Sequence, residues 1–184
     1  MFLLLLGVVM LMLIRPSLSF VPRPPPVRLT PPRSSSTSRH LTISIIAVGK
    51  PGSVSPWLAS GYDAFASRLP SVLKSEWVKD DKALLSKLRK VKDKSSVTLL
   101  DERGDELTSV EFSRALNADL VKCGASVSFV VGAAEGLPRE VKEGGYKKVS
   151  LGKMTLPHGL ARVVLAEQIY RAMEIAKGSK YHKD

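Results

Sequence analysis

The amino-acid sequence predicts an α/β domain over residues 41–184, built on a mostly parallel β-sheet that is flanked by helices. Two observations lead to this fold class. Short, β-branched apolar segments alternate along the chain with segments whose apolar residues recur at helical spacing, which is the pattern of βαβ units. The clearest strand segment, LTISIIAV at residues 41–48, is apolar on both faces, as strands inside a parallel sheet are.

The individual elements follow from local signals along the chain. The expected strands are residues 41–48, 75–79, 96–101, 126–131 and 147–151. The expected helices are residues 56–69, 81–92, 108–122, 138–143 and 159–177. Pro56 suits the first turn of the helix at 56–69, and Pro70 lies just past its end. Gly124 suits the C-terminal cap of the helix at 108–122. The longest helix has an apolar stripe of Ala161, Leu165, Ile169, Ala172, Met173 and Ala176.

The usual nucleotide-binding and metal-binding motifs are missing. A Rossmann domain would place GxGxxG after the first strand, but the sequence there reads VGKPGS, and no P-loop occurs. Cys123 is the sole cysteine, so no intrachain disulfide framework is expected. Without a CxxC motif or a histidine cluster, no metal site is expected either.

The net charge of +11 suggests a polyanionic partner. Five arginines and no acidic residue lie in the first 40 residues, which leaves a charge of +6 for residues 41–184. A basic body is typical of proteins that bind RNA. A need for solubility would explain the same excess of positive charge equally well.

Residues 1–40 have the composition of a bipartite targeting presequence, signal-like over 1–19 and transit-like over 20–40. The apolar run at residues 2–14 is short for a bilayer crossing but has the length of a signal-peptide core, with cleavage expected before Phe20. The following stretch is rich in Pro, Ser and Arg and contains no acid. We expect delivery to the plastid stroma, with no membrane segment left in the mature protein. The alternatives are a buried helix or anchor, secretion, and a mitochondrial destination.

Three further segments have compositions that suit ligand binding. Gly132–Gly136 (GAAEG) follows a buried strand, where α/β sheets bind ligands and small residues let a ligand approach the backbone. Leu151–Gly159 (LGKMTLPHG) suits an adenine held by backbone hydrogen bonds and apolar contacts. The terminal Lys180–Asp184 (KYHKD) suits base stacking and phosphate contacts. Taken singly, each also fits an ordinary turn, a connection or a frayed chain end.

Together these segments resemble one known family, the bacterial methyltransferases that modify N3 of a pseudouridine in large-subunit rRNA. The usual pattern of that family is an IGGxxG turn, then LSxMTxPHxLxRxxLxEQxYRA, then a terminal YHR or YHK with an acid. The run from Phe129 to Asp184 is similar to it throughout, with EQIYRA and YHKD at matching spacing. The opening ISIIAVGK is similar to the first strand of the family, so the resemblance covers nearly all of residues 41–184.

The resemblance implies a SPOUT fold with a C-terminal trefoil knot, a homodimer, and S-adenosyl-L-methionine as the cofactor. It implies no metal. The implied substrate is N3 of a pseudouridine in a 23S-type large-subunit rRNA. With the presequence at residues 1–40, we expect that rRNA to belong to an organellar ribosome. The positions that match the cofactor-binding motif of the family are Leu100, Gly132, Ala133, Gly136, Leu151, Gly152, Lys153, Met154, Thr155 and Leu156.

The chain departs from the family pattern at three places. Ala133 replaces the second glycine of the turn, where a methyl group would narrow the cofactor pocket or demand a negative φ. Gly152 replaces a serine. The segment between Glu76 and Ser96 is shorter than in bacterial relatives, so the expected RNA and dimer contacts of this chain lie elsewhere than in that region.

The resemblance also assigns roles for the transfer itself. His182 is the candidate for proton handling or base orientation, and Tyr181 is the candidate for stacking on the flipped base. Lys183 and Arg162 are candidates for phosphate or carbonyl contacts. His158 is the rival base and a candidate RNA contact, although its place at the start of a helix equally suits a structural role.

Two other functions remain open on the sequence. One is a non-catalytic SPOUT-like factor that binds rRNA or assists ribosome assembly, for which the Ala133 departure is the best support. The other is a SPOUT enzyme that modifies a different RNA position, such as a ribose 2′-hydroxyl.

Overall fold

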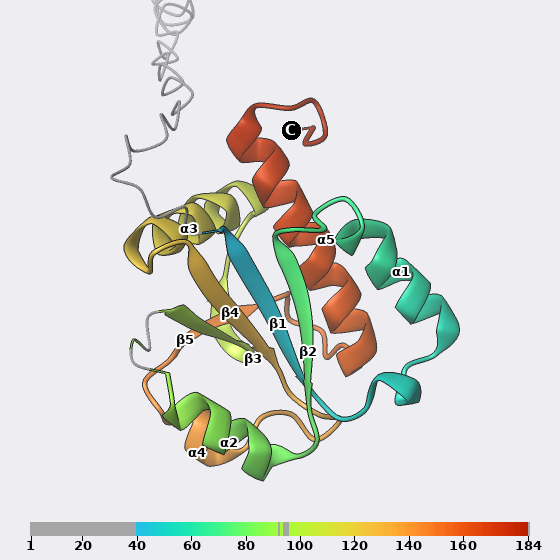
Figure 1. The fold of residues 1–184 in the computed structure, drawn as a ribbon, viewed down its shortest axis with the longest axis vertical. Helices are drawn as coiled ribbons and strands as arrows, with labels where there is room; N and C mark the ends of the chain where they lie inside the picture. Colours follow the sequence, from blue (N-terminus) through green and yellow to red (C-terminus); the bar gives the residue numbers. More distant parts are fainter. Residues whose placement is uncertain (1–39, 92, 94–95, 184) are drawn as a thin grey trace, which may run out of the picture.

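The computed structural model describes residues 40–91, 93 and 96–183, and these form a three-layer α/β structure around one parallel sheet (Figure 1). The sheet has five strands in the order β2-β1-β4-β3-β5, and every pair is parallel. The predicted fold class is therefore confirmed. The targeting presequence proposed for residues 1–40 lies, apart from His40, outside the described residues.

The strands and helices alternate as predicted. The strands are β1 (Thr42–Val48), β2 (Leu73–Val78), β3 (Val97–Glu106), β4 (Ser126–Val131) and β5 (Lys147–Ser150). The helices are α1 (Pro56–Ala66), α2 (Asp81–Arg89), α3 (Ser109–Lys122), α4 (Arg139–Lys142) and α5 (His158–Lys177), with a 3₁₀ turn η1 (Pro51–Ser53). The bounds agree with the prediction to within three residues except at β3.

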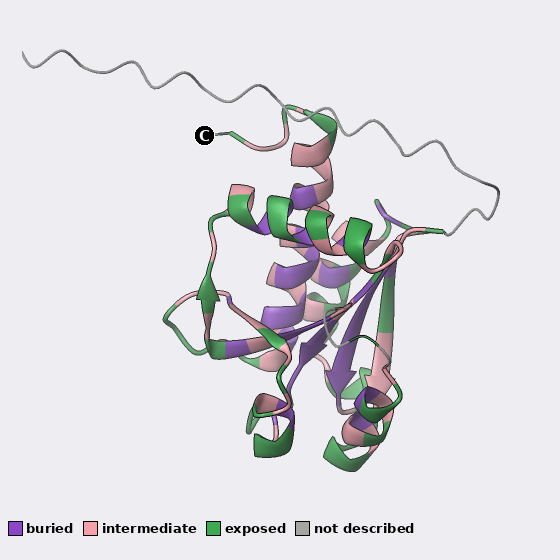
Figure 2. Cartoon of the chain, turned by 90° about the vertical axis from the view of Figure 1, so that its left-hand side faces the viewer, coloured by how far each residue is buried: buried purple, intermediate pink, exposed green. Residues whose placement is uncertain are grey.

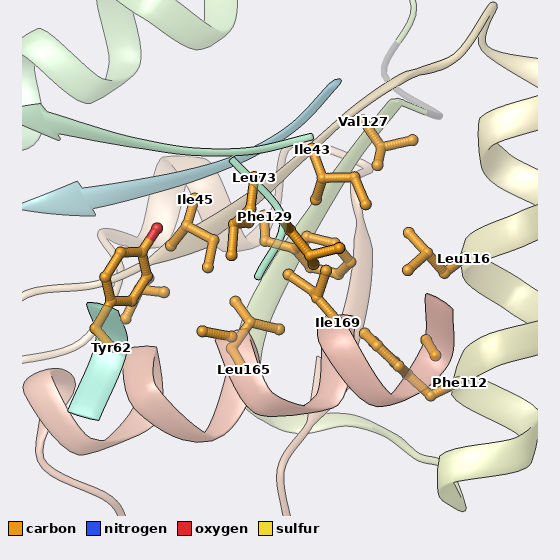
Figure 3. Close-up of a cluster of buried hydrophobic side chains, with 14 of the residues drawn as sticks. Ile43, Ile45, Tyr62, Leu73, Phe112, Leu116, Val127, Phe129, Leu165 and Ile169 are labelled. Atoms are coloured by element: carbon orange, nitrogen blue, oxygen red, sulfur yellow. The ribbon is translucent and has the colours of Figure 1, made fainter. Parts of the chain in front are cut away.

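The helices cover both faces of the sheet, and each face has its own apolar core. On one face, β1 and β4 contribute Ile45 and Phe129, which pack against α1, α3 and α5 through residues such as Leu165 and Ile169 (Figure 3). On the other face, α2 and α4 cover β1, β3 and β4. Burial of both faces explains why the central strands are apolar throughout. Figure 2 shows the central strands largely buried between helices that expose their outer sides.

Strand β3 is longer than predicted because it continues through a bulge. Leu100 and Asp105 both pair with Val149 of β5, so the residues between them loop out of the ladder. The side chain of Asp101 stabilises this loop, since its Oδ1 accepts a 2.9 Å hydrogen bond from the backbone N–H of Arg103. The polar sequence DERGDE has none of the alternation of a strand, so the sequence did not predict this extension.

Helix α5 is the central packing element of the molecule. It lies against α1 and α3 on the same face of the sheet, and Leu165 and Ile169 are fully buried. Gly178 ends it in the left-handed conformation, at φ 70°.

Across residues 40–91, 93 and 96–183, no helix combines the length and apolar content that a bilayer crossing requires.

Candidate active site

A groove of about 520 Å³ opens between the bulge of β3 and the carboxyl ends of β4 and β5. This is where parallel α/β sheets bind ligands, and the volume is in the range of small-molecule sites. Of the ten predicted cofactor residues, nine line the groove: Leu100, Gly132, Ala133, Gly136, Leu151, Gly152, Met154, Thr155 and Leu156. Three segments that are far apart in the sequence therefore meet as one site.

The turn after β4 forms one wall of the groove, and its shape requires a glycine at position 132. A Cβ atom added to Gly132 would lie 2.5 Å from the carbonyl carbon of Gly136, closer than real Cβ contacts come. The N–H of Gly136 donates a 3.0 Å hydrogen bond to the carbonyl of Ala133, which closes the turn. Ala133 has a negative φ, because Ala125 is the only described non-glycine residue with a positive one. The methyl group at Ala133 is thus accommodated without backbone strain.

The loop between β5 and α5 forms the opposite wall. The Ser150 hydroxyl donates a 2.9 Å hydrogen bond to the carbonyl of Gly152, and its oxygen accepts a 3.2 Å hydrogen bond from the Gly152 N–H. Gly152 has φ 130°, which favours glycine at the position where the family has serine. Met154 lines the groove although it is 82% exposed. The predicted cofactor residue Lys153 is exposed and lies outside the lining.

A partly buried ion pair lies in the groove lining, and neither of its members was among the residues predicted for the site. The Asp101 carboxylate and the Lys142 ammonium are 3.4 Å apart, with 2% and 36% of their side chains exposed. Burial raises the pKa of the Asp101 carboxyl, but the Arg103 N–H and the Lys142 charge outweigh it and hold the pKa below its usual value. An acidic residue directly after the apolar run VTLL was the available signal.

The C-terminal tail folds back onto α5. Tyr181 packs edge-on against Tyr170 with 4.9 Å between ring centroids, and its hydroxyl donates a 3.1 Å hydrogen bond to Glu167. Arg171 lies 4.8 Å from the centre of the Tyr181 ring and 3.3 Å from Nδ1 of His182. Burial and the Glu167 carboxylate raise the pKa of Tyr181. The tail is therefore ordered by contacts and is not merely a frayed end.

The tail and the groove lie at opposite ends of α5. His158, the first residue of α5, lines the groove, whereas the tail packs around Arg171. Thirteen residues of helix separate these two positions, which is about 20 Å along the axis. Figure 1 shows the C-terminus at the end of α5 that is remote from the carboxyl ends of β1 and β4. Within one chain, Tyr181, His182 and Lys183 do not line the groove.

Arg162 lies apart from both regions. It is 5% exposed, and its guanidinium is placed between the rings of Tyr62 and Trp77, 4.5 and 4.3 Å from their centres. One of its nitrogens donates a 2.9 Å hydrogen bond to the Ser75 hydroxyl. This arrangement joins α5 to α1 and β2, so the position suits a structural role better than the predicted contact with the substrate.

Comparison with known proteins identifies the family of this chain. The model of the predicted SPOUT methyltransferases matches residues 41–182. The chain belongs to the SPOUT methyltransferase family. The α/β fold expected from the resemblance is accordingly that of a SPOUT methyltransferase, whereas the trefoil knot stays a prediction.

Curated relatives of this SPOUT methyltransferase match over almost their whole length. "Ribosomal RNA large subunit methyltransferase H" of Nitrosomonas eutropha is 33% identical over 157 residues, covering 78% of this chain and 99% of the relative. The protein of the same name from a strain of Prochlorococcus marinus is 38% identical over 149 residues, covering 79% and 99%. A solved probable methylase from Haemophilus influenzae is 14% identical, with a TM-score of 0.46, and covers 77% of this chain and 70% of that one. The structural likeness adds nothing to the assignment, which rests on the family model and the curated relatives.

Proposed function

We propose that this SPOUT methyltransferase uses S-adenosylmethionine to methylate N3 of a pseudouridine in the large-subunit rRNA of an organellar ribosome. The observation that carries the proposal is the match to the curated methyltransferases named for large-subunit rRNA, which extends over 99% of their length. The groove supports it, because the residues matched to the cofactor motif come together there.

The groove suits S-adenosylmethionine in its charge as well as its size. Among the described residues that line it, three carboxylates, those of Asp101, Glu102 and Glu135, stand against one ammonium, that of Lys142. S-adenosylmethionine carries a sulfonium and an ammonium against one carboxylate, so its net charge is positive at neutral pH. A phosphate-bearing cofactor would be repelled by the same lining. The excess of acid in the groove also contrasts with the basic charge of the domain as a whole.

The residues of the groove would hold the cofactor in two ways. The turn from Gly132 to Gly136 lets a ligand approach the backbone closely, and Leu151 to Leu156 offer apolar contacts and backbone groups for an adenine. When bound, the cofactor supplies an activated methyl group. The protein then has to place the nucleophilic nitrogen in line with it and handle one proton. His182 is the proposed proton-handling residue, and Tyr181 the proposed stacking partner of the base.

We propose that the active unit is a homodimer in which the tail of one protomer reaches the groove of its partner. The tail and the groove lie at opposite ends of α5, so a single chain does not bring His182 to the cofactor. The apolar surface of Val163, Val164 and Ile169 is a weaker argument for a dimer, because Ile169 is fully buried within its own chain. Val163 and Val164 remain half-buried. Light scattering should therefore give twice the mass of one chain, and an active monomer would contradict the proposal.

The experiment that tests the proposed function is mass spectrometry of rRNA nucleosides. Ribosomes from cells that lack the enzyme should contain pseudouridine at the target position, and purified enzyme with S-adenosylmethionine should convert it to 3-methylpseudouridine. A methylated ribose or another methylated base would support instead a SPOUT enzyme with a different target. The alternative of a non-catalytic factor loses its main support, because the turn accommodates Ala133 without strain.

We also propose that the protein acts in the plastid stroma. The support is compositional: an apolar run, then Phe20, then twenty residues without an acid. Residues 1–40 fused to a fluorescent protein are expected to direct it into plastids in an alga with complex plastids, with the presequence removed. A fusion that is secreted, or that enters mitochondria, would contradict this destination.

A further inference from the structure

The ion pair in the groove leaves part of a buried carboxylate unsatisfied. Oδ1 of Asp101 accepts the hydrogen bond from Arg103, whereas Oδ2 is buried and accepts no hydrogen bond within the described structure. Lys142 is 3.4 Å from Oδ2, which is longer than a charge-assisted hydrogen bond of about 2.8 Å. A buried carboxylate oxygen without a donor is costly, so its place in a ligand groove indicates that a ligand supplies the donor.

Lys142 is in a position to contact the same ligand. It belongs to α4, lines the groove and keeps 36% of its side chain exposed. Its Nζ lies within 3.9 Å of the place where a Cβ on Gly136 would be, so it borders the cofactor turn as well as Asp101. The groove therefore presents a carboxylate and an ammonium side by side.

We propose that Asp101 and Lys142 recognise the amino-acid end of the cofactor, with Asp101 binding its α-ammonium and Lys142 its α-carboxylate. An α-amino acid carries these two opposite charges on one carbon, and a neighbouring acid and base complement both. The inference rests on the proposed function, because it assumes S-adenosylmethionine in this groove. The rival role for an acid at a strand end is a hydrogen bond to a ribose hydroxyl.

Two ligands separate these roles. S-adenosylhomocysteine has the amino-acid end, whereas 5′-methylthioadenosine has the same adenosine and sulfur without it. Calorimetry on the full chain should show that Asp101→Asn lowers the affinity for S-adenosylhomocysteine at least about tenfold, because a hydrogen bond between two charged groups is lost. The affinity for 5′-methylthioadenosine should stay within about twofold of the wild type. Lys142→Gln should give the same pattern.

The matched control is Asp105→Asn, an exposed acid on the same strand that does not line the groove, and both affinities should be unchanged. The amide oxygen introduced by Asp101→Asn can still accept the Arg103 N–H, and circular dichroism would verify the fold of each variant. If Asp101→Asn lowers the affinity for both ligands equally, Asp101 binds the ribose or maintains the shape of the groove, and the inference is overturned. Unchanged affinities would overturn it too. A wild-type chain that binds neither ligand would instead contradict the proposed function itself.

Discussion

Deletion of Tyr181–Asp184 is expected to abolish methylation of ribosomes while leaving the affinity for S-adenosylmethionine unchanged. All residues that line the groove precede Tyr181, so each truncated chain keeps the residues proposed to hold the cofactor. Methyl transfer does need it if His182 handles the proton, because small misplacements of a catalytic group cost rate steeply. Loss of the Tyr181 contacts with Tyr170 and Arg171 should lower stability by only about 1–2 kcal/mol.

Point variants divide the effect of the tail among its residues. His182→Ala should lower turnover by roughly 10²-fold, the usual contribution of a proton-transfer residue. Lys183→Ala should mainly weaken ribosome binding and make it less dependent on salt, because one phosphate contact is lost. Tyr181→Phe is the matched control, since it removes only the hydroxyl that bonds Glu167 and keeps the ring against Tyr170. Turnover of this variant should remain near the wild-type value.

A mixing experiment tests whether the tail acts on the partner protomer. The chain that lacks Tyr181–Asp184 keeps an intact groove, and the Gly132→Ala chain keeps an intact tail. Mixed dimers of these two variants should regain part of the methylation activity that neither variant has alone. If the truncated enzyme methylates ribosomes at the full rate, the tail has no catalytic role, and His158, which lines the groove, becomes the candidate base.

Gly132→Ala is expected to lower the affinity for S-adenosylmethionine by at least roughly 100-fold, or about 2.8 kcal/mol. The sequence pattern by itself predicts that a side chain here blocks the path of the ligand without disturbing the fold. The structure gives a different reason, because a Cβ at this position lies 2.5 Å from the Gly136 carbonyl carbon and 2.8 Å from the Leu137 nitrogen. The turn from Gly132 to Gly136 must therefore open to admit the methyl group, and this displaces the wall of the groove.

Calorimetry with Gly52→Ala as the control would measure this effect. A Cβ on Gly52 meets no atom within 4 Å, so the same change there should leave cofactor affinity and thermal stability unaltered. Wild-type affinity in a folded Gly132→Ala variant would contradict the prediction. It would show that cofactor binding does not depend on the shape of this turn.

Sequence alone determined most of the fold because the signals for it are local. The apolar segments LTISIIAV and SVSFVV predicted β1 and β4, and the helical stripe around Leu165 and Ile169 predicted the buried side of α5. The cofactor residues were predicted from the resemblance to a known family, and nine of those ten line the groove.

Tertiary structure alone decided which further residues join the site and which candidates lie outside it. The extension of β3 depends on pairing with β5, and the contact between Asp101 and Lys142 joins positions 41 residues apart. The sequence shows that Arg162 is a basic residue, but it does not show that the side chain is buried. Its position between Tyr62 and Trp77 follows from how α5 packs on α1 and β2. The separation of the tail from the groove follows from the direction and length of α5. Local propensity acts over a few residues, whereas these contacts exist only once the layers have packed.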